Sequence, residues 1–178
     1  MQQVKLAMAR ARKLCLLGDF SVGKTSLTRR YIHDDFSLKY QATVGVQLHE
    51  HTDEIETCDG AVTLAQVIWD IEGSRFGEEL ATSYILGASG ALIVGDATRS
   101  DAVSSISSHA RAFLNVLPGR PVVFAMNKSD LVAKDERPQA EELIKTFGGE
   151  LVYTSALTGE AVRALFHALG RRMLEIGA

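Results

Sequence analysis

One glycine-rich segment constrains this chain more than any other feature. Residues 18–25 read Gly-Asp-Phe-Ser-Val-Gly-Lys-Thr, which is a glycine, four further residues and then Gly-Lys-Thr. Residues 14–17 before the segment are apolar, as in a buried strand, and residues 26–32 after it have helical spacing. This context predicts a phosphate-binding loop, because successive backbone N–H groups and the N-terminus of the following helix favour an anion.

The side chains of this loop suit a nucleoside triphosphate. We expect Lys24 to reach the outer phosphates and the Thr25 hydroxyl to ligate a magnesium ion. The neighbours that we expect to line the phosphates are Phe20, Ser21, Val22, Gly23 and Ser26. The alternative is a chance glycine-rich turn before a helix. The loop alone identifies neither the base nor whether a phosphate is cleaved.

Composition places limits on partners and surroundings. The 178 residues are 46% hydrophobic, which argues against disorder and suits one domain over residues 1–178. The net charge of −3 argues against general attraction to nucleic acid or to an anionic membrane. Cys15 and Cys58 are too few for a disulfide framework, so we expect reduced thiols in the cytoplasm. We expect a monomer with no direct lipid anchor, since neither end carries an acceptor at the usual place.

Apolar runs alternate with amphipathic segments along the chain. This pattern predicts an α/β fold with six strands in a mostly parallel sheet, one antiparallel edge hairpin and five flanking helices. The expected strands cover residues 13–17, 46–51, 61–71, 91–95, 121–126 and 151–153. The helices that the sequence places cover residues 24–33, 102–117, 138–147 and 159–175. Motifs that follow strands should meet at one edge of the sheet.

Two motifs after the later strands point to guanine. Residues 127–130 read Asn-Lys-Ser-Asp, and the Asp130 carboxylate can accept both N1–H and N2–H₂ of guanine, whereas adenine offers no such donor pair. Asn127 and Lys128 belong to the same motif. After the last strand, the backbone of Ser155, Ala156 and Leu157 can bind the carbonyl of the base. Together with the phosphate loop, these residues predict GTP or GDP as the ligand.

At this point the chain resembles the small GTPases of the Ras superfamily, and their Rab branch most closely. Residues 40–45, Tyr-Gln-Ala-Thr-Val-Gly, are similar to the first switch, and residues 69–73, Trp-Asp-Ile-Glu-Gly, to the second. Ser83-Tyr84 and residues 87–91 are similar to the Rab segment before the fourth strand. The resemblance spans essentially the whole chain and implies the small G domain of the P-loop NTPases.

The resemblance implies roles for five further residues. Phe36 would stack edge-on against guanine, and Tyr40 would cover the phosphates. Thr43 would ligate magnesium through its hydroxyl and bind the γ-phosphate through its N–H, while Asp70 would hold the ion through a water. The Gly73 N–H would bind the γ-phosphate. Hydrolysis would then release both switch segments, which effectors, exchange factors and GTPase-activating proteins read.

Four positions depart from the family. Ser74 stands where a glutamine orients the attacking water, and Glu72 stands where the family has alanine. We expect Glu72 either to position water in place of the glutamine or to pair with Lys24 when nucleotide is absent, unless it points to solvent. Phe20 stands at a small position beside the γ-phosphate, and Leu157 replaces a lysine whose stem packs on the base. These departures predict slow hydrolysis and a modest loss of guanine affinity.

The resulting expectation is a switch that binds GTP and GDP with magnesium and hydrolyses GTP slowly. The residues assigned to catalysis are Lys24, Thr43, Glu72, Gly73 and Ser74. The alternative is a GTP-binding scaffold or adaptor with negligible hydrolysis. A P-loop kinase for small molecules is a third possibility, but it gives residues 127–130 no role. The five histidines show no metal-ligand spacing and are interpreted as structural or exposed.

Overall fold

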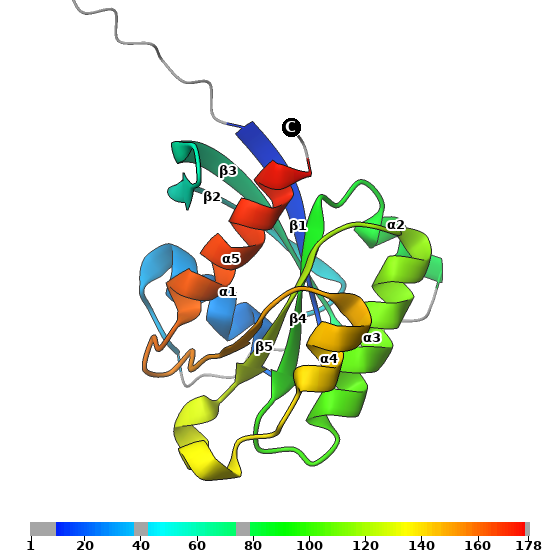
Figure 1. Cartoon of the computed structure of the whole chain (residues 1–178), viewed down its shortest axis with the longest axis vertical. Helices are drawn as coiled ribbons and strands as arrows, with labels where there is room; N and C mark the ends of the chain where they lie inside the picture. Colours follow the sequence, from blue (N-terminus) through cyan, green and yellow to red (C-terminus); the bar gives the residue numbers. More distant parts are fainter. Residues whose placement is uncertain (1–9, 38–42, 74–78, 177–178) are drawn as a thin grey trace, which may run out of the picture.

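The structure is a computed structural model that describes residues 10–37, 43–73 and 79–176. Its strands form one six-stranded sheet in the order β2-β3-β1-β4-β5-β6 (Figure 1). All neighbouring strands are parallel except β2 and β3, which form the antiparallel edge hairpin that the sequence predicts. The strands are β1 (Arg10–Leu17), β2 (Val46–Thr57), β3 (Gly60–Ile71), β4 (Gly90–Asp96), β5 (Val122–Asn127) and β6 (Leu151–Tyr153).

Helices cover both faces of this sheet. Within the described ranges they are α1 (Lys24–His33), α2 (Glu79–Ile85), α3 (Ala102–Val116), α4 (Glu141–Phe147) and α5 (Val162–Glu175), and two 3₁₀ turns are η2 (Ser129–Leu131) and η3 (Lys134–Glu136). Helices α1 and α5 lie on one face, and α2, α3 and α4 lie on the other (Figure 1). The sequence predicts five helices and places four of them; α2 is the fifth.

The central strands are apolar on both sides because both sides are covered. Along β1, Leu14 and Leu16 enter the core beneath α1 and α5, whereas Cys15 and Leu17 enter the core beneath α2, α3 and α4. A strand buried on both faces reads as a continuous apolar run rather than an alternating one. This is why residues 14–17 are recognisable as a strand in the sequence.

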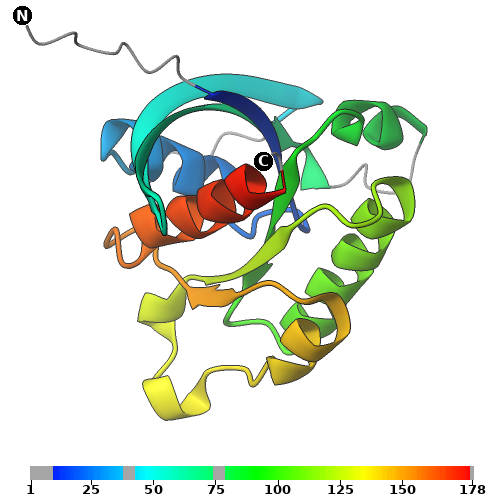
Figure 2. The same cartoon turned by 45° about the horizontal axis from the view of Figure 1, so that its top comes forward.

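The β2–β3 hairpin is longer than the sequence predicts. Strand β2 continues to Thr57, beyond the predicted end at residue 51, and both strands curve around α5 (Figure 2). Residues 52–57 look too polar for a strand, but pairing with β3 continues and buries Ile55 completely. Gly170 of α5 allows this close packing, since a Cβ there would lie 3.2 Å from Ile55 Cδ1.

Other boundaries shift by a few residues. Strand β1 begins at Arg10 rather than at residue 13, because its pairing with β3 already starts there. Helix α4 begins at Glu141 rather than at 138, and α5 begins at Val162 rather than at 159. Ala161 has φ 54°, a left-handed conformation that no helix continues, so α5 cannot start earlier.

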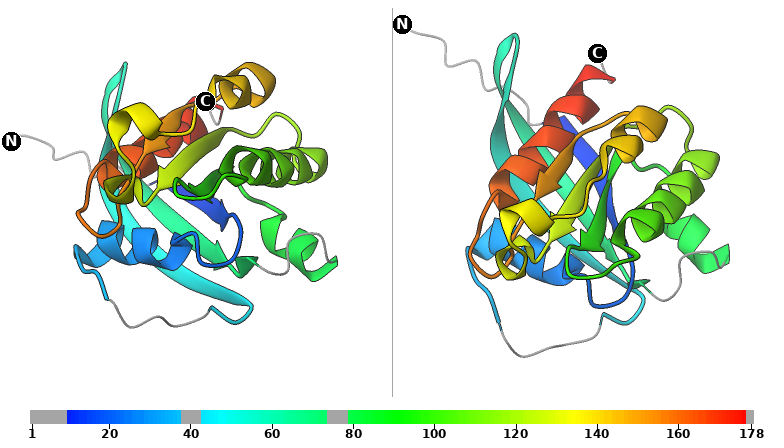
Figure 3. Two further views of the ribbon diagram at one scale, coloured as in Figure 1. Left: turned by 90° about the horizontal axis from the view of Figure 1, so that it is seen from below. Right: turned by 60° about the horizontal axis from the view of Figure 1, so that its bottom comes forward.

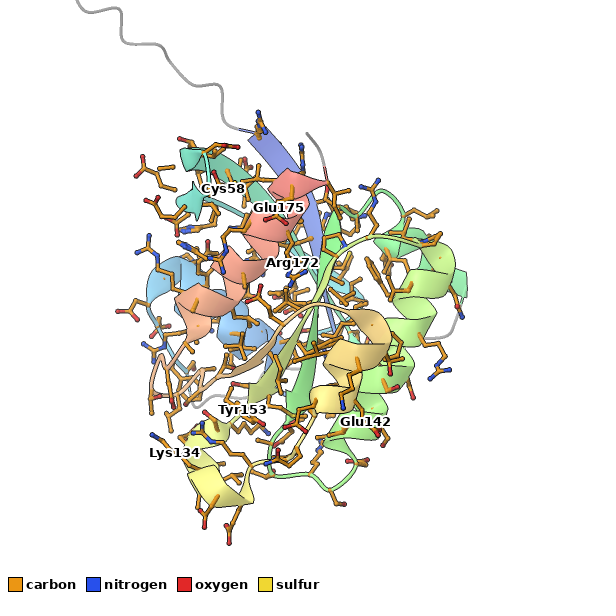
Figure 4. The ribbon with its side chains drawn as sticks, in the orientation of Figure 1. Cys58, Lys134, Glu142, Tyr153, Arg172 and Glu175 are labelled. Atoms are coloured by element: carbon orange, nitrogen blue, oxygen red, sulfur yellow. The ribbon has the colours of Figure 1, made fainter. Side chains whose placement is uncertain are left out.

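Both cysteines are free thiols in this structure. Cys58 lies exposed in the turn that joins β2 to β3, at the opposite end of the molecule from Lys134 (Figure 4). Cys15 is buried in β1, and burial raises the pKa of its thiol to about 12. In the described part of the chain, none of the helices has both the length and the apolar character needed to cross a membrane.

Candidate functional site

A cavity of about 610 Å³ opens at the carboxyl ends of the strands, a volume that suits a nucleotide-sized ligand. The loop after β1, the end of β3 and the loops after β5 and β6 contribute to its wall, and Figure 3 shows these segments along one edge. The predicted site residues that line it are Phe20, Ser21, Gly23, Lys24, Thr25, Ser26, Phe36, Thr43, Glu72, Gly73, Asn127, Lys128, Asp130, Ala156 and Leu157.

The other predicted site residues fall into two groups. Val22, Asp70 and Ser155 are buried behind the cavity wall. Tyr40 and Ser74 lie outside the described residues. The structure therefore brings together, at one edge of the sheet, every predicted site residue that it describes. Whether these residues bind a nucleotide stays a prediction.

The glycines of the loop after β1 are required by close contacts. Gly18 has φ 143°, and a Cβ there would lie 2.2 Å from the Val94 carbonyl oxygen in β4. Gly23 has φ 100°, and its Cβ would lie 2.3 Å from Nδ2 of Asn127. Real Cβ atoms do not approach other atoms so closely, so neither position accepts a side chain without movement. The loop can therefore run close to Val94 of β4 and Asn127 of β5 and lead directly into α1.

Lys24 is a buried cation at the start of α1. Its side chain is 7% exposed, and Nζ donates hydrogen bonds to the carbonyl oxygens of Gly18 at 2.8 Å and Asp19 at 2.9 Å. Burial lowers the pKa of Lys24 to about 8, against the opposing charges of Asp70, Asp19 and Glu72. The ammonium group therefore sits inside the curve of the loop, where a phosphate would compensate its charge.

Three oxygen-bearing side chains meet beside Lys24. The hydroxyl oxygens of Thr25 and Thr43 are 2.8 Å apart, and Thr25 also donates to Oδ2 of Asp70. Burial raises the pKa of Asp70, against the Thr25 hydrogen bond and the nearby Lys24 and His49. Among the described residues, Oδ1 of Asp70 is buried without a hydrogen-bond partner. Oxygen ligands with an unsatisfied carboxylate fit Mg²⁺, which prefers hard oxygen donors.

Glu72 makes a contact that the sequence did not predict. Its Oε2 accepts a hydrogen bond from the Gly45 N–H at 2.9 Å, and its own N–H donates to the Gly45 carbonyl at 2.9 Å. The segment before β2 and the segment after β3 are therefore joined by a reciprocal pair. The expected water-positioning or Lys24-pairing role of Glu72 stays a prediction.

Gly73 packs directly against the loop after β1. A Cβ on Gly73 would lie 2.5 Å from both the Asp19 carbonyl carbon and the Phe20 nitrogen. Only glycine permits this approach without a shift of backbone atoms. Next to this contact, Phe20 is 47% exposed, and its carbonyl accepts a hydrogen bond from Arg99 at 3.1 Å.

Asn127 links the loop after β1 to the loop after β6. Its Nδ2 donates to the Val22 carbonyl at 2.9 Å, and its Oδ1 accepts from the Ala156 N–H at 3.2 Å and the Thr154 hydroxyl at 3.3 Å. All these groups are buried. One amide at the end of β5 therefore fixes the relative positions of two walls of the cavity.

Lys128 and Asp130 line the cavity from the loop after β5, whereas Thr25 and Thr43 line it from α1 and the segment before β2. Lys128 has φ 63° and donates from Nζ to Oδ2 of Asp96 at 2.5 Å. The Asp96 side chain is only 4% exposed, so the lysine is anchored at the end of β4. Asp130 is exposed at the cavity wall, where its carboxylate is free to meet a ligand's donors.

Sequence reasoning missed seven residues of the cavity wall, two of which lie on β2; the seven are Arg29, His33, Asp35, Ser37, Gln47, His49 and Leu131. Gln47 and His49 of β2 line it, although His49 was interpreted as structural or exposed. The signal was present in the hairpin pattern, because antiparallel pairing puts Gln47 opposite Asp70 and His49 opposite Ile68. Alternate residues of β2 therefore face the same side as Asp70.

The comparisons with known proteins agree with this geometry. Residues 13–175 match the Ras family. This chain belongs to the Ras family. It is similar to the Ras-related protein Rab-13 of Mesocricetus auratus, with 31% identity over 165 residues that cover 91% of this chain and 79% of that protein.

Further relatives also carry Rab names. The Ypt/Rab-type GTPase YPT7 of Saccharomyces cerevisiae is 32% identical over 172 residues, which cover 92% of this chain and 81% of that protein. The Ras-related protein Rab-31 of Mus musculus is 31% identical over 171 residues, which cover 94% of this chain and 86% of that protein. This Ras-family chain is therefore Rab-like, as the sequence motifs indicate.

Proposed function

We propose that this Ras-family protein is a guanine-nucleotide switch that binds GTP and GDP with Mg²⁺ and hydrolyses GTP slowly. The observation that carries the proposal is the cluster of Thr25, Thr43 and Asp70 beside the buried Lys24. The three side chains come from α1, the segment before β2 and β3. Their meeting links both switch segments to the phosphate loop, which is what a nucleotide-dependent switch requires.

The base end of the cavity supports guanine as the ligand. We expect the Asp130 carboxylate to accept from the N1–H and N2–H₂ donors and the backbone of Ser155, Ala156 and Leu157 to bind the carbonyl of the base. In this structure the Ser155 and Ala156 N–H groups donate to the Glu160 carbonyl and to Asn127 Oδ1. Phe36, which is partly buried against the core and lines the cavity, would contact the ring edge-on. Lys128 offers the aliphatic stem on which the base packs.

The phosphate end supports hydrolysis by in-line attack of water. The Thr25 and Thr43 hydroxyls and Asp70 would hold Mg²⁺, which supplies positive charge to the phosphate oxygens. Lys24 and the N–H groups of the loop and of Gly73 would stabilise the charge that develops on the γ-phosphate. Ser74 in place of glutamine leaves the attacking water without its usual orienting group, which makes the reaction slow.

The proposal includes partners that read the switch segments. Effectors, exchange factors and GTPase-activating proteins would contact residues near Thr43 and Gly73, as they do in a nucleotide-dependent switch. We propose that the protein acts as a cytoplasmic monomer. The acidic net charge of −3 supports the absence of nucleic acid among its partners.

The nucleotide that co-purifies with the protein tests this proposal first. We expect GTP or GDP, identified by chromatography after denaturation, and no adenine nucleotide; a preference for ATP would contradict the proposal. Phosphate release is then measured over multiple turnovers for the wild type and for Lys24→Ala. Slow release above the Lys24→Ala background supports the switch. Retained GTP without such release favours the scaffold, for which the half-exposed Phe20 at the cavity is the supporting observation.

A further inference from the structure

Helix α3 contacts the phosphate loop from outside the cavity. The Asp19 carboxylate accepts a hydrogen bond from the Ser105 hydroxyl at 2.5 Å and another from Nε2 of His109 at 2.9 Å. Ser105 and His109 are four residues apart on α3, so they lie on one face of the helix. Each oxygen of one carboxylate therefore has its own donor from α3.

This contact is a defined site rather than a chance surface pair. The His109 side chain is 8% exposed, and that of Asp19 is 37% exposed. Burial raises the pKa of the Asp19 carboxyl, but the hydrogen bonds from Ser105 and His109 and the charges of His109 and Arg99 outweigh it, so the pKa is lowered overall. The carboxylate is held ionised and in place.

The peptide group between Asp19 and Phe20 contacts several parts of the site. Its carbonyl oxygen accepts a hydrogen bond from Lys24, and the Phe20 carbonyl accepts one from Arg99. The same Asp19–Phe20 peptide also packs against Gly73, the residue whose N–H is assigned to the γ-phosphate. A movement of Asp19 would therefore be transmitted to both Lys24 and Gly73.

We propose that Ser105 and His109 are positioning residues that set the preference of the loop for GTP over GDP. They hold the Asp19–Phe20 peptide against Gly73, so that the loop and the second switch are positioned together to bind a γ-phosphate. GDP lacks the γ-phosphate that the Gly73 N–H is assigned to bind, so its affinity depends less on the position of the loop relative to Gly73. The inference rests on the proposed function and deepens it, since it names what maintains nucleotide discrimination.

A purely structural role for the contact makes a different prediction. If Ser105 and His109 only attach α3 to the rest of the fold, their loss weakens both nucleotides equally through a loss of stability. The ratio of the two affinities therefore separates a positioning role from a structural one. That ratio does not change when only the folded fraction changes.

The test measures the dissociation constants of GDP and of a non-hydrolysable GTP analogue, with Mg²⁺, for four variants. His109→Leu removes the donor, His109→Gln keeps an N–H donor, and Ser105→Ala removes the hydroxyl. Ser108→Ala is the control, because the Ser108 hydroxyl donates to the Ser104 carbonyl of the same helix and not to the loop. For His109→Leu we expect about tenfold weaker binding of the GTP analogue, the size typical for loss of a hydrogen bond to a charged group.

The expected pattern distinguishes this inference from the proposed function. Binding of GDP should weaken by less than about twofold in His109→Leu. His109→Gln should restore most of the lost affinity for the GTP analogue. Ser108→Ala should bind both nucleotides as the wild type does. Ser105→Ala should change the ratio in the same direction and decides the matter if His109→Leu fails to fold. An unchanged ratio in a folded variant overturns the inference and leaves the proposed function standing. Failure of the wild type to bind either nucleotide overturns both.

Discussion

At the base end of the cavity, Asn127 and Lys128 join neighbouring segments through side-chain hydrogen bonds, whereas at the phosphate end, beside the Thr25–Thr43–Asp70 cluster, the segments after β1 and β3 also touch backbone to backbone. Asn127 joins two loops through its amide, and Lys128 is anchored by Asp96. At the other end, Gly73 lies against the Asp19–Phe20 peptide, and Glu72 binds the backbone of Gly45. A side-chain network tolerates few substitutions, while backbone packing leaves neighbouring side chains free to vary.

The positions at which this sequence departs from the small GTPases that it resembles follow this division. The base end has the expected Asn127, Lys128 and Asp130, with only Leu157 differing. The phosphate end carries Phe20, whose backbone nitrogen lies against Gly73, and Glu72, which binds the Gly45 backbone through both its side chain and its own N–H. Nucleotide binding and nucleotide hydrolysis should therefore respond separately to mutation. The following predictions test that separation, from the largest expected effect to the smallest.

Asn127→Ala should weaken nucleotide binding about a hundredfold. The substitution leaves the buried Val22 carbonyl and the Ala156 N–H without their partner. Two such losses cost about 3 kcal/mol, which corresponds to roughly a hundredfold in affinity. Release of a fluorescent guanine nucleotide measures the effect, with Thr154→Val as the control, because it removes only the longer 3.3 Å contact to the same amide. Equal effects of the two variants would contradict the special position of Asn127.

Gly73→Ala should break the phosphate end while leaving the base end intact. Its new Cβ would lie 2.5 Å from the backbone of Asp19 and Phe20, so the second switch must move away from the loop. Overpacking of this kind typically costs about 1–3 kcal/mol. We expect about tenfold weaker binding of a GTP analogue and little change for GDP, measured by titration. Parallel weakening of both nucleotides would mean that the two ends are not separate.

Glu72→Ala should loosen the connection between the switch segments. Loss of the carboxylate leaves the Gly45 N–H without this acceptor, and we expect nucleotide release to accelerate about fivefold. Glu72→Gln keeps an acceptor oxygen and should lie closer to the wild type. Single-turnover hydrolysis of the two variants shows in addition whether the carboxylate assists the attacking water. If neither nucleotide release nor GTP hydrolysis changes, Glu72 has no role at the phosphate end of the cavity.

Asp96→Asn should have the smallest effect, on stability and its pH dependence. Burial raises the pKa of Asp96, but hydrogen bonds from Lys128 and Thr98 outweigh it and lower the pKa below 3.8. Because the folded pKa is depressed, the stabilisation is complete above pH 3.8 and is lost as the pH falls through the lower folded value. In urea unfolding, we expect the free energy of unfolding of Asp96→Asn to be lower than that of the wild type by about 1 kcal/mol at pH 7 and by less in acid.

The matched control for Asp96→Asn is Asp101→Asn. Asp101 is an exposed N-cap residue whose side chain makes no capping hydrogen bond. We expect its variant to follow the wild type at both pH values. A similar response of the two variants would remove Asp96 from the base-end network.

The fold and most of the cavity follow from the sequence because their signals are local. Residues 14–25 contain a strand, a loop and a helix start in immediate succession, and Asn127 follows a buried strand. Parallel strands then bring such motifs to one edge without further information. The register of β2 beyond residue 51 was missed, since a polar strand is fixed by its partner rather than by its own residues.

Contacts between side chains far apart in sequence were not predictable. His109 and Asp19 are 90 positions apart, and nothing in the pattern of α3 indicates that its histidine faces the loop. Glu72 was expected near Lys24 or a water, but its contact with Gly45 depends on how two loops approach each other. Single-sequence reasoning supplies residue types at strand ends; it does not supply the geometry between loops.

The hydrogen bond from Asn127 to Val22 also has a consequence for how the protein is made. Its two partners are 105 positions apart in the chain. At about 5–20 residues per second, a ribosome needs on the order of ten seconds between adding Val22 and adding Asn127. During that time the nascent phosphate loop lacks the amide that fixes it. We expect a nascent chain stalled before β5 to retain no guanine nucleotide, so ligand capture belongs to the later part of synthesis.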